Sequence, residues 1–174
     1  HGASDVIVLK LDITKNNNIK KSVKKIVKSF GKIDILVNNV GIAVWKDFKD
    51  YTFKDIETEL RTNLEGNIKF TKECLPYIKE CILNVSSRLG ITADCKKSTV
   101  YSASKFGLRG FTQALAMELD NVKIFAINPG LTATQMTDFE GIPASKVADI
   151  IVQTVKSKNK IKTGSDINVY EMLK

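Results

Sequence analysis

The sequence predicts an α/β fold in which a doubly wound parallel sheet is covered by helices on both faces, giving three layers. Short β-branched apolar runs alternate with longer stretches of helical period, as in successive strand–helix–strand units. At 174 residues with 43% hydrophobic content, the chain has the size of one domain and can bury a substantial core. We therefore expect a single domain over residues 1–174.

Five apolar runs are predicted to be strands because they are short and rich in β-branched residues. In chain order they are Val6 to Leu11, Ile33 to Asn38, Cys81 to Ser86, Lys123 to Asn128 and Asp166 to Tyr170.

Four longer stretches are predicted to be helices. Asn18 to Phe30 carries apolar residues at the spacing of a surface helix, and Gly31 is placed to end it. Thr52 to Lys79 is a long helix interrupted by three residues of low helix propensity, Asn63, Gly66 and Asn67, so its interior needs another explanation. The remaining two are Thr99 to Leu119 and Pro143 to Ser157, the latter with a proline in its first turn.

Charge and composition exclude several classes of function. The 27 Lys and Arg against 19 Asp and Glu give a formal net charge of +8, but most lysines occupy polar helix positions and no basic stripe is interleaved with aromatics. We expect neither nucleic acid nor a membrane as a partner. No apolar run approaches the roughly 20 residues of a membrane span, so a soluble, cytoplasmic protein is expected.

Metal and histidine chemistry are not expected either. Cys74, Cys81 and Cys95 have neither redox-motif nor zinc spacing, and an odd, sparse count indicates reduced thiols. The only histidine is His1, so a Ser-His-Asp triad is excluded within this polypeptide. Acid–base chemistry must therefore use other groups.

Tyr101 and Lys105 offer such groups. They stand four apart near the start of a predicted helix, so a phenol and an ammonium face one site. A neighbouring cation favours the phenolate, which would make the tyrosine a usable proton donor and acceptor. The bare motif is common on helices and becomes informative only in its context.

That context is a set of motifs in a fixed order. Tyr101-Ser102-Ala103-Ser104-Lys105 is preceded by Leu83-Asn84-Val85-Ser86-Ser87 and followed by Asn128-Pro129-Gly130, while Asn38-Asn39-Val40-Gly41 ends a strand and Asn63 lies in Asn63-Leu64-Glu65-Gly66. From about Val6 to about Thr137 the chain resembles the short-chain dehydrogenase/reductase family. The resemblance implies a Rossmann-like fold and an NAD(P)-dependent oxidoreductase, a carbonyl reductase or alcohol dehydrogenase.

The resemblance also implies a role for each matching residue. Tyr101 would be the acid/base on the substrate oxygen, and Lys105 would lower its pKa and bind the nicotinamide ribose. Ser87, rather than Ser86, would donate to the same oxygen. Asn63 would hold a water that relays protons through Lys105.

Cofactor contacts are implied likewise, for NADP or NAD. Asp12, with Ile13 beside it, would bind adenine, although Asp12 could instead be a plain helix cap. Asn38, Val40 and Gly41 would flank the adenosine ribose. Four residues after the fourth strand would close over nicotinamide: Pro129, Gly130, Thr132 and Thr134. Ser87 and the Asn128-Pro129-Gly130 segment also have a simpler interpretation as turn residues.

The family's Gly-rich phosphate turn has no counterpart in the sequence, and neither do its first two strands and helices. We expect the natural protein to be longer, and this chain by itself to fold poorly or bind cofactor weakly. Two alternatives stay open: an epimerase or dehydratase of the same fold, and a non-catalytic scaffold or binding protein that has lost cofactor binding.

The substrate is expected to be a small carbonyl or alcohol of unspecified identity. The segments Arg88 to Ser98 and Leu131 to Ile142 would line its pocket, whereas Trp45 and Phe48 are predicted to be core or packing residues. The resemblance implies a homodimer or homotetramer built partly from the Thr52 and Thr99 helices.

Overall fold

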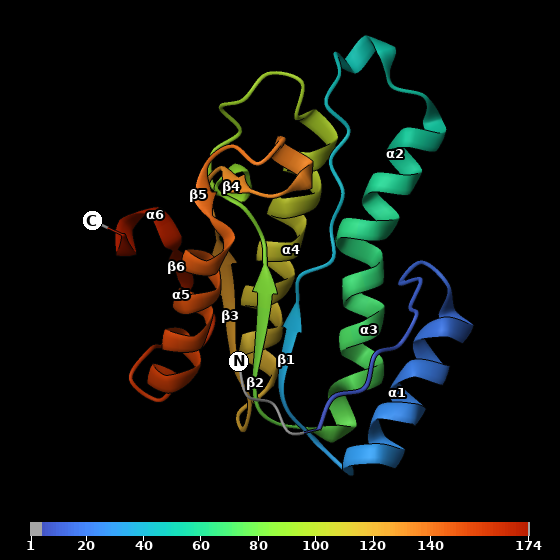
Figure 1. Ribbon diagram of the computed structural model, residues 1–174, viewed down its shortest axis with the longest axis vertical. Helices are drawn as coiled ribbons and strands as arrows, with labels where there is room; N and C mark the ends of the chain where they lie inside the picture. Colours follow the sequence, from blue (N-terminus) through green and yellow to red (C-terminus); the bar gives the residue numbers. More distant parts are fainter. Residues whose placement is uncertain (1–4, 174) are drawn as a thin grey trace.

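The computed structural model describes residues 5–173 and shows a parallel four-stranded sheet between two layers of helices (Figure 1). The strand order is β1-β2-β3-β6, and every neighbouring pair is parallel. These strands are β1 (Ile33–Asn38), β2 (Ile78–Val85), β3 (Lys123–Asn128) and β6 (Asp166–Asn168). The doubly wound, Rossmann-like architecture is confirmed.

The helices divide between the two faces of the sheet. They are α1 (Asn16–Phe30), α2 (Phe53–Leu60), α3 (Asn67–Cys74), α4 (Thr99–Glu118), α5 (Ala144–Ser157) and α6 (Val169–Met172). One buried cluster joins Val23 of α1, Cys74 of α3 and Ala116 of α4 to one sheet face. The other joins Val147 and Ile150 of α5 to the opposite face, where it covers β2 and β3 but leaves Ile35 and Val37 of β1 exposed.

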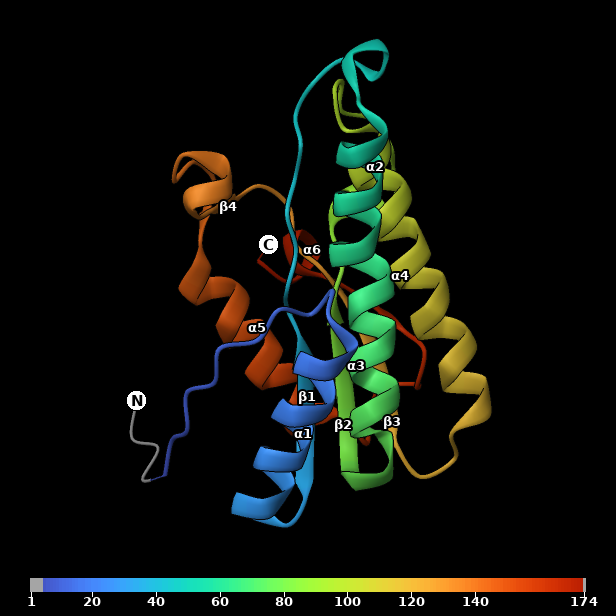
Figure 2. The ribbon, with the colours of Figure 1, turned by 90° about the vertical axis from the view of Figure 1, so that its right-hand side faces the viewer.

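The segment Val6 to Leu11 is not a strand, and this prediction was wrong. Its residues have no sheet pairing, and Val8 is 90% exposed. Figure 2 shows the segment standing apart from the sheet before it reaches α1. Apolar, β-branched composition alone does not make a strand, because the backbone needs a neighbouring strand to hydrogen-bond, and the described residues supply none here.

The long helix predicted from Thr52 to Lys79 is divided. A capping box between Thr52 and Asp55 starts α2, a π-helical turn covers Arg61–Gly66, and α3 follows. The helix ends well before Lys79, at a 3-10 turn over Leu75–Tyr77, because Pro76 cannot continue the α-helical hydrogen bonding. β2 consequently begins at Ile78, three residues before its predicted start.

The remaining boundaries differ by less. Gly31 ends α1 with a φ of 76° and donates its N–H to the Val27 carbonyl, as predicted. β6 stops at Asn168 instead of Tyr170, because its partner β3 ends at Asn128, the residue paired with it. The sequence did not reveal a two-stranded parallel pair between β4 (Thr132–Ala133) and β5 (Ile142–Pro143), nor the short 3-10 turns Phe48–Asp50, Arg88–Gly90 and Gln135–Thr137.

A buried polar network crosses the middle of the sheet. The Asn38 amide donates to Asn84 Oδ1 on the neighbouring strand and to Thr71 Oγ1 on α3, both at 2.7 Å. Asn84 donates to Thr112 Oγ1 of α4 at 2.9 Å. The network therefore ties β1, β2 and two helices together through amide and hydroxyl groups that would be costly to bury unpaired.

Within residues 5–173, no helix combines the length and the apolar character that crossing a membrane requires.

Candidate active site

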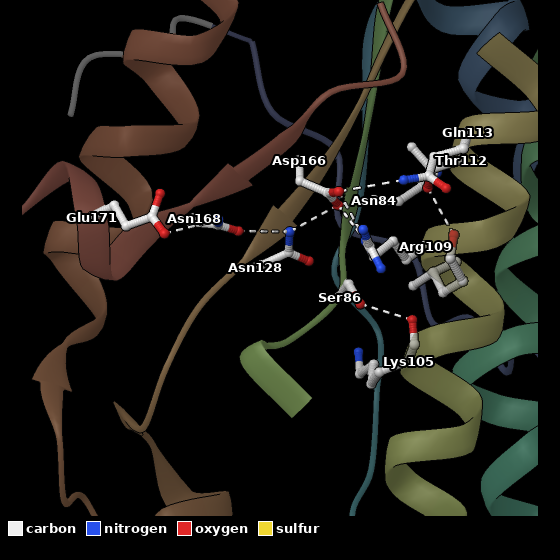
Figure 3. A network of polar contacts seen from close by, with 11 residues as sticks. Asn84, Ser86, Lys105, Arg109, Thr112, Gln113, Asn128, Asp166, Asn168 and Glu171 are labelled. Atoms are coloured by element: carbon white, nitrogen blue, oxygen red, sulfur yellow. Dashed lines mark hydrogen bonds and ion pairs between the residues drawn. The ribbon is translucent and has the colours of Figure 1, made fainter. Parts of the chain in front are cut away.

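The start of α4 lies against the carboxyl end of β2 and brings Tyr101 and Lys105 to that edge of the sheet. Both side chains are buried. The Lys105 ammonium donates to the carbonyl of Val85, the last residue of β2, at 2.9 Å. The Ser86 hydroxyl donates to the Lys105 carbonyl at 2.9 Å (Figure 3). Two hydrogen bonds thus fix this turn of α4 on the strand end, where open α/β sheets bind ligands.

Two glycines allow the close packing around Lys105. A Cβ on Gly90 would lie 2.9 Å from the Lys105 carbonyl oxygen and 2.6 Å from Ser86 Oγ. A Cβ on Gly41 would lie 3.3 Å from Lys105 Nζ and 3.4 Å from Asn63 Oδ1. The first glycine lets the turn after β2 approach the helix backbone, and the second brings the turn after β1 beside the ammonium.

Ser87 lies beside Tyr101. The two side chains are hydrogen-bonded, and Ser87 Oγ also accepts the Leu89 N–H at 3.1 Å, which caps the turn that follows. Burial raises the pKa of Tyr101, the Ser87 hydrogen bond partly offsets this, and the charge of Glu59 raises it further. The phenol is therefore held in its protonated form.

Lys105 does not act on Tyr101 in the way the sequence suggested. Its Nζ lies 5.6 Å from the centre of the tyrosine ring, and the pKa of Tyr101 is raised instead of lowered. Burial also lowers the pKa of Lys105 itself, to about 8, because the charged ammonium loses water. Burial is thus the largest cause of the pKa shift in both groups.

Asn63 is fully buried in the π-helical turn and holds its surroundings together. Its Oδ1 accepts the Ile42 N–H, and its amide donates to the Ile42 carbonyl, each at 2.8 Å. The same amide donates to Ser104 Oγ on α4 at 3.0 Å. These bonds explain a polar residue inside that helix; π-helical turns also occur frequently at functional sites.

The residues expected near adenine form a turn before α1. Asp12 Oδ1 accepts the backbone N–H of Thr14 at 2.9 Å and its hydroxyl at 2.6 Å, an Asx turn, and these bonds lower the pKa of Asp12. Asp12 is exposed, and the N-cap of α1 is Lys15, so the plain cap interpretation does not hold. Ile13 is buried against Gly66, where a Cβ would lie 2.8 Å from Ile13 Cγ2.

The residues expected near the adenosine ribose differ in how far they are buried. The Asn38 side chain points into the polar network of the sheet, which leaves only its backbone for a ligand. Val40 is exposed, and its carbonyl accepts from the Asn67 amide at 3.2 Å. Gly41 lies beside Lys105, with its Cβ position 3.3 Å from Nζ.

The segment after β3 joins the same edge. The Pro129 carbonyl accepts the Arg88 N–H at 2.7 Å, which connects this segment to the turn of Ser87. The Thr132 hydroxyl donates to the Gly130 carbonyl at 3.0 Å, and a Cβ on Gly130 would meet nothing within 4 Å. Thr134 caps the turn Gln135–Thr137. Gly130 thus leaves free space beside the strand end.

An ion pair below this edge was not foreseen. Arg109 of α4 binds both carboxylate oxygens of Asp166, at 2.9 and 2.8 Å, and the Asn128 amide donates to the same carboxylate at 3.1 Å (Figure 3). This group of side chains connects α4, β3 and β6. Arg109 and Asp166 are 57 residues apart in sequence, so no local sequence pattern reveals their ion pair.

Trp45 and Phe48, predicted to be core or packing residues, are not in the core, but each packs on a neighbouring aromatic ring. They are 44% and 59% exposed. Trp45 packs on Tyr101, with ring centres 5.5 Å apart and planes at 41°. Sequence reasoning also missed Glu59, a fully buried carboxylate that accepts the Val44 N–H at 3.0 Å; its spacing of four from Asn63 was the available signal.

Comparisons with known proteins agree with this geometry. A family model described as short chain dehydrogenase matches residues 1–142. An uncharacterized oxidoreductase of Schizosaccharomyces pombe is 34% identical over 143 residues, covering 79% of this chain and 60% of that protein. A 3-oxoacyl-[acyl-carrier-protein] reductase of Thermotoga maritima is 37% identical over 134 residues, covering 74% of this chain and 54% of that protein.

Solved structures extend the likeness to three dimensions. A 3-oxoacyl-[acyl-carrier protein] reductase from Brucella melitensis, in complex with NAD, superposes with a TM-score of 0.85 at 25% identity, covering 92% of this chain and 75% of that chain. A short chain dehydrogenase from Burkholderia cenocepacia, in complex with NADP, superposes with a TM-score of 0.84 at 25% identity, covering 91% and 72%. The chain spans 53 to 60% of the length of the first three curated relatives it matches.

Proposed function

The chain belongs to the short-chain dehydrogenase family, and from that premise we propose that it is an NAD(P)-dependent oxidoreductase that interconverts carbonyl and hydroxyl groups of small molecules. The observation that carries the proposal is the pairing of the buried Tyr101 with the half-buried Ser87. Their side chains are hydrogen-bonded to each other beside Lys105 at the carboxyl end of β2. Two hydroxyl groups there can donate to one substrate oxygen.

Tyr101 is the proposed acid/base. Since burial raises its pKa, the phenol keeps its proton near neutral pH and can give it to a carbonyl oxygen as that oxygen becomes a hydroxyl. Ser87 donates a second hydrogen bond and stabilises the charge that develops on the oxygen. In the reverse direction Tyr101 first gives up its own proton, and the phenolate then accepts the proton of the alcohol.

Lys105 and Asn63 are proposed to support that proton transfer. An amine with a pKa of about 8 is close enough to neutrality to exchange a proton. Asn63 holds the Ile42 backbone and Ser104 beside Lys105, and would keep a relaying water near the amine.

The residues present fit a nicotinamide cofactor on the side of the sheet edge where Gly41 and Gly130 lie. Lys105 uses one of its three N–H groups on Val85 and has others for a ribose hydroxyl, and the space beside Gly130 is free of neighbouring atoms within 4 Å. Asp12, Ile13, Asn38 and Val40 would contact the adenosine half, and Pro129, Thr132 and Thr134 the nicotinamide half. When bound, the cofactor supplies or accepts the hydride. Relatives bound to NAD and to NADP both exist, so either cofactor is proposed.

We also propose a cytoplasmic homodimer or homotetramer. The outward side of α4 exposes Phe106 and Met117. Over α2 and α3 a surface hollow of about 620 Å³ is lined by Leu60, Leu64 and Ile68 among others, and apolar surface of this kind supports self-association. Cys74, Cys81 and Cys95 are unpaired, the state that a reducing compartment maintains.

The test is nucleotide binding followed by turnover. NADH and NADPH are titrated separately against the protein by nucleotide fluorescence, and ketone-dependent oxidation is followed by absorbance. Tyr101→Phe should keep nucleotide binding and lose about a hundredfold or more of the turnover, while Tyr77→Phe, on the turn before β2, should behave as wild type. Binding of neither nucleotide, or full activity of Tyr101→Phe, would refute the proposal.

A further inference from the structure

The segment between β1 and α2 runs lengthwise beside α2 and α4 (Figure 1). Every second residue of it contacts the helix that begins at Phe53 and continues through the π-helical turn. Asn63 binds both backbone groups of Ile42 at 2.8 Å, Glu59 accepts the Val44 N–H at 3.0 Å, and Asp55 accepts from the Lys46 ammonium at 2.6 Å.

These contacts form a ladder with matched spacing. The helical partners Asp55, Glu59 and Asn63 are four residues apart, which is a rise of about 6 Å per step. The contacting residues of the segment are two apart, which is about 6.6 Å per step in a stretched chain. The two repeats coincide, so three consecutive rungs hold the segment in one register.

The alternate residues of the segment contact α4. Gly41 lies beside the Lys105 ammonium, with 3.3 Å between its Cβ position and Nζ. Trp45, four residues on, packs on the Tyr101 ring at 5.5 Å between ring centres. Tyr101 and Lys105 both lie on α4, so the segment contacts α4 on this side and the helical stretch from Asp55 to Asn63 on the other.

Trp45 is consequently a large aromatic residue fixed beside the reacting phenol, with 44% of its surface still exposed. A ring that served only to fill the core would be covered, whereas this ring packs on the Tyr101 ring and leaves part of its surface exposed. Aromatic rings attract flat π systems in offset or tilted arrangements at this range of distances.

Building on the proposed oxidoreductase function, we propose that Trp45 is a specificity-determining residue that binds a flat aromatic group next to the carbonyl carbon of the substrate, and that the ladder from Asp55 to Asn63 positions it. The substrate class is therefore aryl ketones and aldehydes and the matching aryl alcohols.

Glu59 is the central rung and a positioning residue, because it acts on Trp45 through the segment backbone. Its carboxylate is fully buried, and Tyr51 closes the same rung by donating its hydroxyl to the Val44 carbonyl, with Glu59 Oε2 at 3.4 Å. A buried carboxylate is costly to keep without such partners, so its contacts fix the position of residue 44 and hence of Trp45 beside it.

The test compares acetophenone with cyclohexyl methyl ketone, which has the same acetyl group on a ring that is not flat. Trp45 is the single tryptophan of the chain, so one indole N–H signal in the NMR spectrum reports on it. Acetophenone should shift this signal saturably. Dissociation constants come from saturation-transfer measurements on each ketone, and acetophenone should bind about three- to tenfold more tightly.

Variants at three positions show which residues cause the preference for acetophenone. It should disappear in Trp45→Ala, persist in part in Trp45→Phe, and be unchanged in Phe48→Ala, whose exposed ring contacts Tyr51 and not Tyr101. Glu59→Gln keeps an oxygen for the Val44 N–H and should retain the preference, whereas Glu59→Leu should lose it while its circular dichroism spectrum stays that of the folded protein.

The outcomes separate this inference from the proposed function, because the assay uses neither nucleotide nor turnover. Equal binding of the two ketones, binding of neither, or a preference that survives in Trp45→Ala overturns the inference, whatever the nucleotide titration shows. A preference that depends on Trp45 supports it even if the oxidoreductase proposal fails.

Discussion

Lys105→Met should change how the stability of this protein depends on pH. The pKa of Lys105 falls from 10.5 to about 8 on folding, since its ammonium is buried. Between those values the folded protein binds fewer protons than the unfolded chain, so the wild type gains stability as the pH rises through this window. Below pH 8 the full cost of the buried charge is present. Methionine has a similar length and no proton to lose, so the variant lacks this gain.

The size of the effect follows from the two pKa values. From pH 7 to pH 9 the Lys105 contribution is about 1.3 kcal/mol in favour of the folded wild type. Burial also raises the pKa of Cys74 to about 12 and raises that of Cys81, which lowers stability as the pH rises above about 9. Both thiols are present in wild type and variant, so their contribution cancels in the difference between the two proteins.

The assay is urea unfolding of both proteins at pH 7 and at pH 9, followed by circular dichroism. With a slope of about 2 kcal/mol per molar urea, the difference in midpoints should change by about 0.6 M between the two pH values. Lys72→Met, at an exposed lysine of α3, should show the pH dependence of the wild type. If wild type and Lys105→Met change in parallel, the lysine is not a buried charge and its proposed proton exchange loses its basis.

Two further substitutions test the packing around the site. Gly90→Ala should destabilise the fold by about 1 to 3 kcal/mol, since its Cβ would meet the Lys105 backbone at 2.9 Å. Gly110→Ala, in α4 with open space around it, should instead stabilise the fold by about 0.5 to 1 kcal/mol. Equal urea midpoints for the two variants would contradict the close approach of Gly90 to the Lys105 backbone. Asp166→Asn should cost about 1 to 3 kcal/mol by leaving Arg109 without its two-oxygen partner, against at most about 1 kcal/mol for Asp34→Asn in the exposed pair with Lys32. Similar losses of stability in Asp166→Asn and Asp34→Asn would show that the Arg109–Asp166 pair is no better shielded from solvent than the Lys32–Asp34 pair.

Local pattern was sufficient for much of the fold. The runs Ile33–Asn38 and Lys123–Asn128 are short, apolar and bounded by breakers, and both strands have the predicted limits. The same rule failed for Val6 to Leu11, since pairing depends on a neighbour that composition does not reveal. Pro76 was visible in the sequence, and giving it full weight would have ended the long helix correctly.

Some features of the candidate site also follow from local sequence spacing, and others do not. Tyr101 and Lys105 are four apart on one helix, so their proximity follows from sequence spacing alone. The contact of Trp45 with Tyr101 joins residues 56 positions apart and depends on the course of an irregular segment. The direction of the Tyr101 pKa was beyond sequence reasoning because it reflects burial, which only the packed structure determines.

The amide pair between Asn38 and Asn84 has a consequence for how the sheet assembles. The β1–β2 pairing is irregular between Ile33 and Ile35 and keeps one register from Ile35 to Asn38. The two asparagines stand opposite each other, and a slip of one residue would break the hydrogen bond from the Asn38 amide to Asn84 Oδ1. They therefore favour the observed register of the two strands, in addition to the apolar side chains, which a slip of one residue would turn to the opposite face.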